Sequence, residues 1–216
     1  MTYNFFGKCI LKRSFLPKYI PVFLLKVYRH LKALLFKYKS VLRFVALFLG
    51  SYLVLSLLYG LYLKIAEGSE YPPDIITHLV ARQSSSVINS LGYVASVVPG
   101  SSEPTMQLYV ENKFLARIIE GCNAVSIIIL FTAFVIAFAE RFKKTFLFIL
   151  AGAVLIYAVN ILRIVILAVA LYEYPQHKEL LHGVVFPGLI YGMVFVLWMM
   201  WIRMLKLKTL SDEKQG

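Results

Sequence analysis

Four long apolar stretches constrain this chain more than any other feature of its sequence. They lie at Phe44–Leu63, at about Cys122–Ala139, from just after Lys144 to about Tyr172, and at Gly183–Ile202. A spanning helix needs about 20 mainly apolar residues, and lipid offers backbone groups no hydrogen-bond partner. With 60% hydrophobic and 16% charged residues, the chain is too apolar for a water-surrounded domain. We therefore predict an all-α polytopic integral membrane protein with about four transmembrane helices.

The distribution of basic residues predicts the orientation of these helices. Residues 1–43 carry ten Lys or Arg and no acid, whereas the 66–121 loop carries six acids against three basic residues. By the positive-inside rule, both termini lie in the cytoplasm, and the 66–121 and 173–182 loops face outward from the cytoplasmic (inner) membrane. The net charge of +12 then indicates contact with anionic lipid at the cytoplasmic face, and no nucleic acid is expected.

The chain accordingly divides into five predicted segments. In order, these are a basic cytoplasmic segment with an amphipathic helix (1–43), a first transmembrane helix (44–65), an extracytoplasmic loop (66–121), a three-helix membrane core (122–203) and a cytoplasmic tail (204–216). The amphipathic helix is expected at 17–39, lying on the inner leaflet. Within the last apolar stretch, Gly188 and Gly192 form a Gly-x-x-x-Gly motif, which predicts a close approach between helices.

The 66–121 loop is expected to carry structure of its own. Asp74 is a typical N-cap for a helix at 75–91, whose apolar residues Ile76, Val80, Val87 and Leu91 would lie on the outer leaflet. Further along, apolar runs at 106–110 and 114–119 flank a turn at 111–113, which predicts a small extracytoplasmic β-hairpin.

Three polar residues are not explained by solvation in lipid. Arg163 lies inside the third stretch, with Asn160 one turn earlier on the same face. An arginine deep in a membrane costs about 2.5–3.5 kcal/mol on insertion scales, so Arg163 faces a partner or a wet cavity, or else extends to the outer headgroups. Cys122 begins the second stretch, where the positive end of a helix favours a thiolate; it is otherwise a small buried residue. His182 opens the fourth stretch, where a histidine also serves as a polar cap.

The combination of these residues is more informative than each residue alone. Cys122, Arg163 and His182 come from three different stretches and lie at the same outer level. Together they can supply a nucleophile, an oxyanion or carboxylate stabiliser, and a general base or acid. Cys9 lies on the opposite side of the membrane and cannot pair with Cys122, and His177 is a weaker candidate in the outer loop. No clustered zinc ligands occur, and neither a metal nor an organic cofactor is expected.

At these positions the chain resembles the exosortase/archaeosortase family of membrane-embedded cysteine proteases or transpeptidases. The resemblance covers about residues 35–203 and rests on three motifs: Glu120–Ala124 (Glu-Gly-Cys-Asn-Ala), Asn160–Arg163 (Asn-Ile-Leu-Arg) and His182–Gly183. The common Cys-Ser-Gly version of the first motif is Cys-Asn-Ala here. This motif, together with the stretch at 38–44, looks most like the exosortase F subfamily.

The resemblance implies that the protein cleaves secreted proteins that end in a sorting signal, which consists of a short motif, one transmembrane helix and a basic cluster. Cys122 would attack the scissile carbonyl from the outer face, Arg163 would hold the oxyanion, and His182 would protonate the leaving amine. The supporting residues are Glu120, Asn123 and Asn160. The residues alone leave two alternatives open: a non-enzymatic membrane scaffold or partner subunit of an envelope assembly, and a transporter with an intramembrane arginine.

Overall fold

The computed structural model describes the greater part of the chain. It covers residues 32, 36–66, 73–100, 103–139, 141–177, 179 and 181–213, with the backbone alone at 177, 181, 182, 186 and 206–213. The chain divides into two units, Met1–Arg43 and Phe44–Gly216, and the second unit contains the fold and the candidate site. The amphipathic helix expected at 17–39 lies almost entirely outside the described residues and stays a prediction.

Three helices of the described chain are long and apolar enough to cross a membrane. They are α2 (Lys39–Ala66), α5 (Phe142–Glu173) and the segment Gly183–Leu205, which is formed by the π-helical turn Leu181–Val185 and α7 (Phe186–Glu213). The stretch expected at Cys122–Ala139 contains a shorter apolar helix, α4 (Val125–Ala137), of 13 residues. A polytopic, mostly helical membrane protein is therefore confirmed in outline, while the count of four spans stays a prediction.

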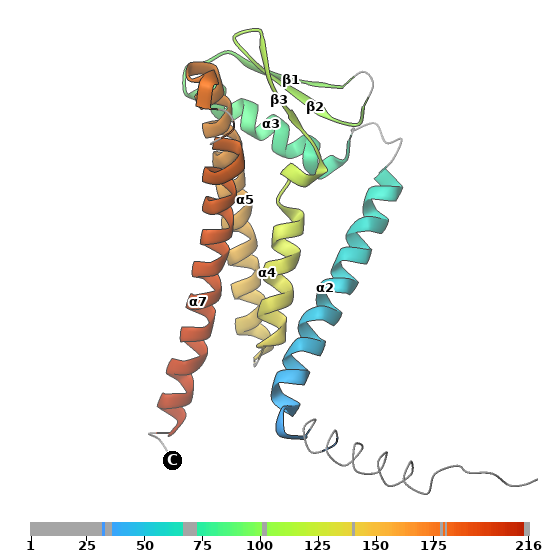
Figure 1. The fold of residues 1–216 in the computed structure, drawn as a ribbon, viewed down its shortest axis with the longest axis vertical. Coiled ribbons are helices and arrows are strands. Elements are labelled where there is room, and N and C mark those ends of the chain that lie inside the picture. The colour runs from blue at the N-terminus through green and yellow to red at the C-terminus, as the bar shows by residue number, and fades with distance from the viewer. Residues whose placement is uncertain are drawn as a thin grey trace, which may run out of the picture. The chain divides into compact units, whose positions relative to one another are not determined.

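Helices α4, α5 and α7 pack side by side (Figure 1) around a buried aromatic cluster. The ring of Phe131 on α4 lies 5.8 Å from that of Phe148 on α5, which in turn lies 4.7 Å from the ring of Trp201 on α7. Helix α2 contacts α4 through aromatic rings as well, with Phe48 and Phe134 6.5 Å apart. Large apolar side chains therefore hold the helices together. Helices in lipid associate through van der Waals packing, to which pairs of aromatic rings contribute.

Gly152 of α5 lies directly against a side chain of another helix. A Cβ atom at this position would overlap the ring of Phe131, which belongs to α4 and is fully buried. The expected close approach at Gly188 and Gly192 is wrong for the described residues, because nothing lies within 4 Å of a Cβ at either position. The face of α7 that packs on the bundle consists instead of Ile190, Val194, Leu197 and Trp201.

We expect Gly152→Ala to destabilise the bundle by about 1–3 kcal/mol, because the added methyl overpacks a site whose neighbour is enclosed. Gly50→Ala is the matched control: Gly50 also lies inside a long helix, and nothing lies within 4 Å of a Cβ there. Each change should also stabilise its helix by about 1 kcal/mol, because alanine has a higher helix propensity than glycine. The measurement is the thermal unfolding midpoint in detergent. Equal midpoints for the two variants would contradict the close contact.

A helix and a small sheet lie together at one end of α4, α5 and α7 (Figure 1), and we call them the head. The head consists of α3 (Ile75–Ser90), β1 (Ala95–Pro99), β2 (Met106–Val110) and β3 (Lys113–Ile118), with antiparallel strands in the order β1-β2-β3. The predicted hairpin is confirmed, and its turn residues Glu111 and Asn112 have positive φ angles of 49° and 60°, as in type I′ turns. Strand β1 was not predicted, so the sheet has three strands instead of two.

Helix α3 begins as predicted but packs through a different face. The Asp74 carboxylate accepts hydrogen bonds from the N–H groups of Ile76 (2.9 Å) and Thr77 (3.1 Å). The buried residues of α3 are Thr77, Val80, Ala81, Ser84, Ser85 and Ile88. Of the four apolar residues expected on one face, only Val80 belongs to this set, and Leu91 is exposed. The small residues on the buried face allow α3 to approach both the sheet and α5, which the apolar spacing alone did not indicate.

Candidate active site

Cys122 lies in the short connection between the head and the membrane helices. It ends the 3-10 turn η1 (Glu120–Cys122), and its side chain is half-buried. Its N–H donates to the carbonyl of Ile119 at 2.8 Å. The chain then passes through Ala124, whose φ of +64° lies in the left-handed region, and enters α4. The thiol is therefore placed at the head end of α4, as the sequence predicted.

Asn123, the residue after the cysteine, ties this connection to two other helices. It is 1% exposed, and its Nδ2 donates to the Tyr59 hydroxyl of α2 at 2.8 Å and to the Thr77 hydroxyl of α3 at 3.0 Å. Its Oδ1 accepts from the N–H of Val125 at 2.9 Å. The side chain thus supplies the start of α4 with a hydrogen-bond acceptor and fixes the cysteine-bearing loop against α2 and α3.

Asn160 and Arg163 of α5 approach the same loop from the opposite side. The Asn160 Nδ2 donates to the carbonyl oxygen of Cys122 at 2.7 Å, and the Arg163 Nη1 donates to the Asn160 Oδ1 at 3.5 Å. The Arg163 Nε is buried and has no hydrogen-bond partner among the described residues. Within that part of the chain, the salt bridge found joins Arg117 to Glu103, so no described carboxylate neutralises Arg163. Its guanidinium is left to bind an anionic or developing negative charge.

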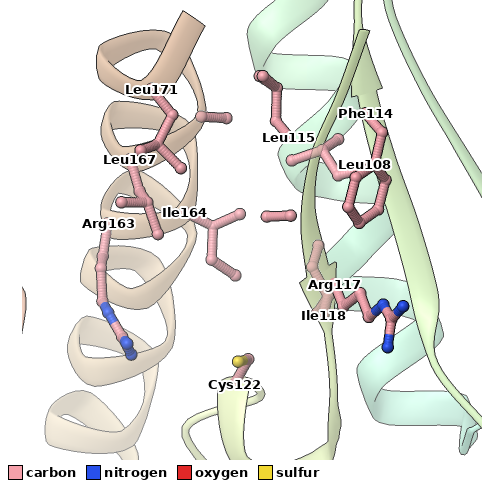
Figure 2. A pocket seen from close by; sticks show the side chains of 12 residues that line it. Leu108, Phe114, Leu115, Arg117, Ile118, Cys122, Arg163, Ile164, Leu167 and Leu171 are labelled. Carbon is pink, nitrogen blue, oxygen red and sulfur yellow. The ribbon is translucent and has the colours of Figure 1, made fainter. Parts of the chain in front are cut away.

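A cavity of about 370 Å³ lies between β3 and α5, and both Cys122 and Arg163 line it. Figure 2 shows the Cys122 sulfur and the Arg163 guanidinium at the same end of this cavity, reached from opposite walls. Its remaining lining, apart from Arg117, is apolar: Leu108, Phe114, Leu115, Ala116, Ile118, Ile164, Leu167, Ala168 and Leu171. A thiol and an unneutralised guanidinium therefore share an apolar cavity of the size that small ligands occupy.

Comparison with known proteins adds an independent finding. Residues 33–204 match the model of the family described as transmembrane exosortase (Exosortase_EpsH). The chain belongs to this family. Comparisons with curated proteins and with solved structures gave no match. Membership of the exosortase family indicates a membrane transpeptidase or protease role, and the matched range includes Cys122, Asn160, Arg163 and His182.

The structure of this exosortase brings some of the predicted site residues together and leaves others undecided. The hydrogen bonds described above connect Cys122, Asn160 and Arg163. Asn123 fixes the cysteine-bearing loop to α2 and α3. Glu120 is half-buried in η1, and its carboxylate joins no ion pair with a described residue. The backbone at His182 belongs to the π-helical turn before α7, and its side chain lies outside the described part. Its role stays a prediction.

Two residues of the exosortase site were not found by sequence reasoning. Tyr59 and Thr77 receive the hydrogen bonds of Asn123, although neither belongs to a recognised motif. The sequence did contain an indication of Tyr59, because this residue lies near the same predicted membrane level as Cys122. The residues Cys122, Arg163 and His182 were grouped on that criterion. Thr77 carries no such signal, because its contact depends on how α3 folds over the membrane helices.

We expect Asn160→Asp to reduce the activity of this exosortase by about 10²-fold, the typical cost of a small misplacement near the reacting atoms. Aspartate removes the donor to the Cys122 carbonyl and places a carboxylate beside Arg163, which neutralises its guanidinium. Gln83→Glu is the matched control: it makes the same chemical change but keeps the oxygen that accepts from the Tyr157 hydroxyl at 2.7 Å. The measurements are substrate processing and thermal midpoint. Equal processing by the two variants would contradict a positioning role for Asn160.

Proposed function

We propose that this exosortase is a membrane-embedded cysteine protease or transpeptidase that cleaves C-terminal sorting signals of secreted proteins at the outer face of the cytoplasmic membrane. One observation carries the proposal: Cys122 and Arg163, on different elements, line the same cavity, and Asn160 bonds the backbone of the cysteine. Within the family, the motif around the cysteine supports the exosortase F subfamily.

The reaction begins with the thiolate of Cys122, which attacks the scissile carbonyl carbon and forms an S–C bond. The carbonyl oxygen becomes an oxyanion, and the Arg163 guanidinium stabilises it in an apolar site where a charge-assisted hydrogen bond is strong. The C–N bond then breaks, and His182 protonates the leaving amine. Water or an acceptor amine, deprotonated by His182, then attacks the acyl carbon and breaks the S–C bond, which releases the product and restores the Cys122 thiolate and the protonated His182.

The proposed topology has four spans, with both termini in the cytoplasm. Helix α4 counts as the second span together with the residues that precede it, because the stretch from about Cys122 to Ala139 falls within the range of about 17–25 residues that a crossing needs. The basic residues at 141–144 stay inside, and the acidic 66–121 loop lies outside. This places the head, Cys122 and the cavity on the outer face.

The proposed partners are secreted proteins that carry a C-terminal transmembrane sorting signal. The transmembrane helix of such a signal enters the membrane beside the exosortase, and the scissile bond meets Cys122 at the boundary between head and bundle. The basic residues of segment 1–43 contact anionic lipid of the inner leaflet. The chemistry assigned to Cys122, Arg163 and His182 uses neither a metal ion nor an organic cofactor.

Thiol labelling tests the proposed side and reactivity of Cys122 together. In right-side-out vesicles that contain the Cys9→Ala variant, we expect an anionic, membrane-impermeant methanethiosulfonate to modify Cys122 faster than it modifies N-acetylcysteine at pH 7, because a catalytic cysteine is an activated nucleophile. Cys9 in the Cys122→Ala variant should react only after permeabilisation. Labelling of Cys9 alone from outside would contradict the topology. A Cys122 rate no higher than that of the model thiol would favour a non-enzymatic scaffold.

A further inference from the structure

Strand β3 has an unused hydrogen-bonding edge. It lies at one side of the three-stranded sheet and pairs with β2 alone. Among the described residues, no backbone hydrogen bond joins β3 to any other element. Its outer N–H and C=O groups are therefore available to another extended chain, which is the usual property of an edge strand.

This free edge borders the cavity that contains Cys122 and Arg163. Five consecutive residues of β3, Phe114 to Ile118, line the cavity. The pairing of β3 with β2 shifts register between Leu108 and Tyr109, which leaves Leu115 unpaired. Beyond this irregularity, successive side chains point to opposite faces: Ile118 is buried toward the core, whereas Arg117 is exposed. Residues from both faces can line one cavity when the cavity lies along the edge of the strand. Figure 2 shows β3 forming one wall and α5 the other.

We propose that the substrate segment around the scissile bond binds as an extended strand along β3, hydrogen-bonded to its free edge and enclosed by α5. This inference rests on the proposed function and specifies how the same site takes its substrate. The direction of β3 supports it, because the strand ends at Ile118 and the chain reaches Cys122 four residues later. A segment paired along β3 is thereby led to the thiol and to the guanidinium of Arg163.

The cavity walls define the chemistry that the strand must present. Leu108, Leu115, Leu167 and Leu171 line it, so apolar side chains at alternate positions of the bound segment are accommodated. Backbone pairing then supplies affinity, and the apolar walls supply selectivity, as in other cases of strand addition. A helical segment would not satisfy β3, because its own backbone donors and acceptors are already bonded internally.

A peptide alkylating agent tests this binding mode without a natural substrate. The probe is acetyl-Leu-Leu-Leu chloromethyl ketone, in which the Cys122 thiolate displaces chloride and forms a thioether. We expect it to alkylate Cys122 of the Cys9→Ala protein, in lipid nanodiscs, at least tenfold faster than chloroacetone does, which carries the same chloromethyl ketone without the peptide. Equal rates, while chloroacetone still reacts, would overturn strand binding and leave the proposed function intact.

N-methylation of the probe distinguishes strand pairing from general apolar binding. Alternate N–H groups of an extended chain face the same edge. Of two probes methylated at adjacent peptide nitrogens, we therefore expect one to lose at least tenfold in rate and the other less than threefold. Equal rates for the two would overturn the proposal. This comparison uses the protein without changes in the cavity, so it does not depend on the folding of a variant.

A bulky residue in the α5 wall provides the complementary test. Leu167→Trp fills the cavity opposite β3 and should lower the ratio of the tripeptide rate to the chloroacetone rate to about one. Leu162→Trp is the control, because Leu162 lies on the same helix, does not line the cavity and is 51% exposed; its ratio should match that of the parent protein. An undiminished ratio in Leu167→Trp would overturn the assigned path. Failure of the proposed function is distinguishable, since Cys122 would then react no faster than a model thiol.

Discussion

Cys122→Ala is expected to abolish processing of sorting-signal substrates while the protein inserts and accumulates normally. The variant removes the proposed nucleophile but none of the described hydrogen bonds of the fold, because the hydrogen bonds of this residue are made by its backbone N–H and carbonyl groups. Cys122→Ser should lose most of the activity, since a hydroxyl is a weak nucleophile near neutral pH without the activation that a serine enzyme provides. The measurement is the ratio of precursor to mature substrate at matched enzyme level.

Cys9→Ala is the control for this experiment. Cys9 lies in the segment predicted to be cytoplasmic, so its loss should leave the precursor ratio at the value of the parent protein. Normal processing in cells that contain only Cys122→Ala would contradict the assignment of the nucleophile and, with it, the enzymatic function.

Arg163→Lys is expected to lower processing by about 10²–10³-fold, the usual loss when one preorganised donor of an oxyanion site is removed. The guanidinium of Arg163 reaches Asn160 with one nitrogen and keeps a buried Nε without a described partner. Lysine keeps the positive charge but has a single ammonium group on a flexible stem, so it cannot reproduce this planar arrangement.

The alternative role of Arg163 predicts a different result. If the side chain only anchors the helix at the lipid headgroups, lysine should serve equally well. Arg43→Lys, in the first turns of α2, is the control and should leave the precursor ratio unchanged. A ratio for Arg163→Lys equal to that of the control would remove Arg163 from the site.

The parts of the structure that depend on local patterns could be predicted from the sequence. Apolar length predicted α2, α5 and the span that contains α7, because the need to satisfy the backbone in lipid leaves few alternatives. The i, i+3 spacing of Asn160 and Arg163 predicted their shared face, and the hairpin followed from its turn. The candidate site residues Cys122 and Arg163 could be selected because a polar side chain at or inside an apolar span is costly unless it has a partner or a function.

The parts that depend on tertiary pairing could not be predicted in this way. Strand β1 ends at Pro99, and a proline by itself indicates a turn or the end of an element. Residues 95–99 form a strand because β2 pairs with them. The glycine that permits close helix packing is Gly152 rather than the Gly188 and Gly192 pair, since the deciding factor is the large ring of Phe131 on another helix. The cavity likewise exists only once β3 and α5 face each other.

Ala124 has a consequence for the readiness of the nucleophile. Its φ of +64° costs an L-residue about 1–2 kcal/mol that glycine would avoid. Alanine nevertheless has far fewer backbone conformations available than glycine, and its methyl group is buried in the cluster that contains Phe131. The loop that carries Cys122 is therefore preorganised: its conformational freedom is given up during folding and need not be given up again in each catalytic cycle.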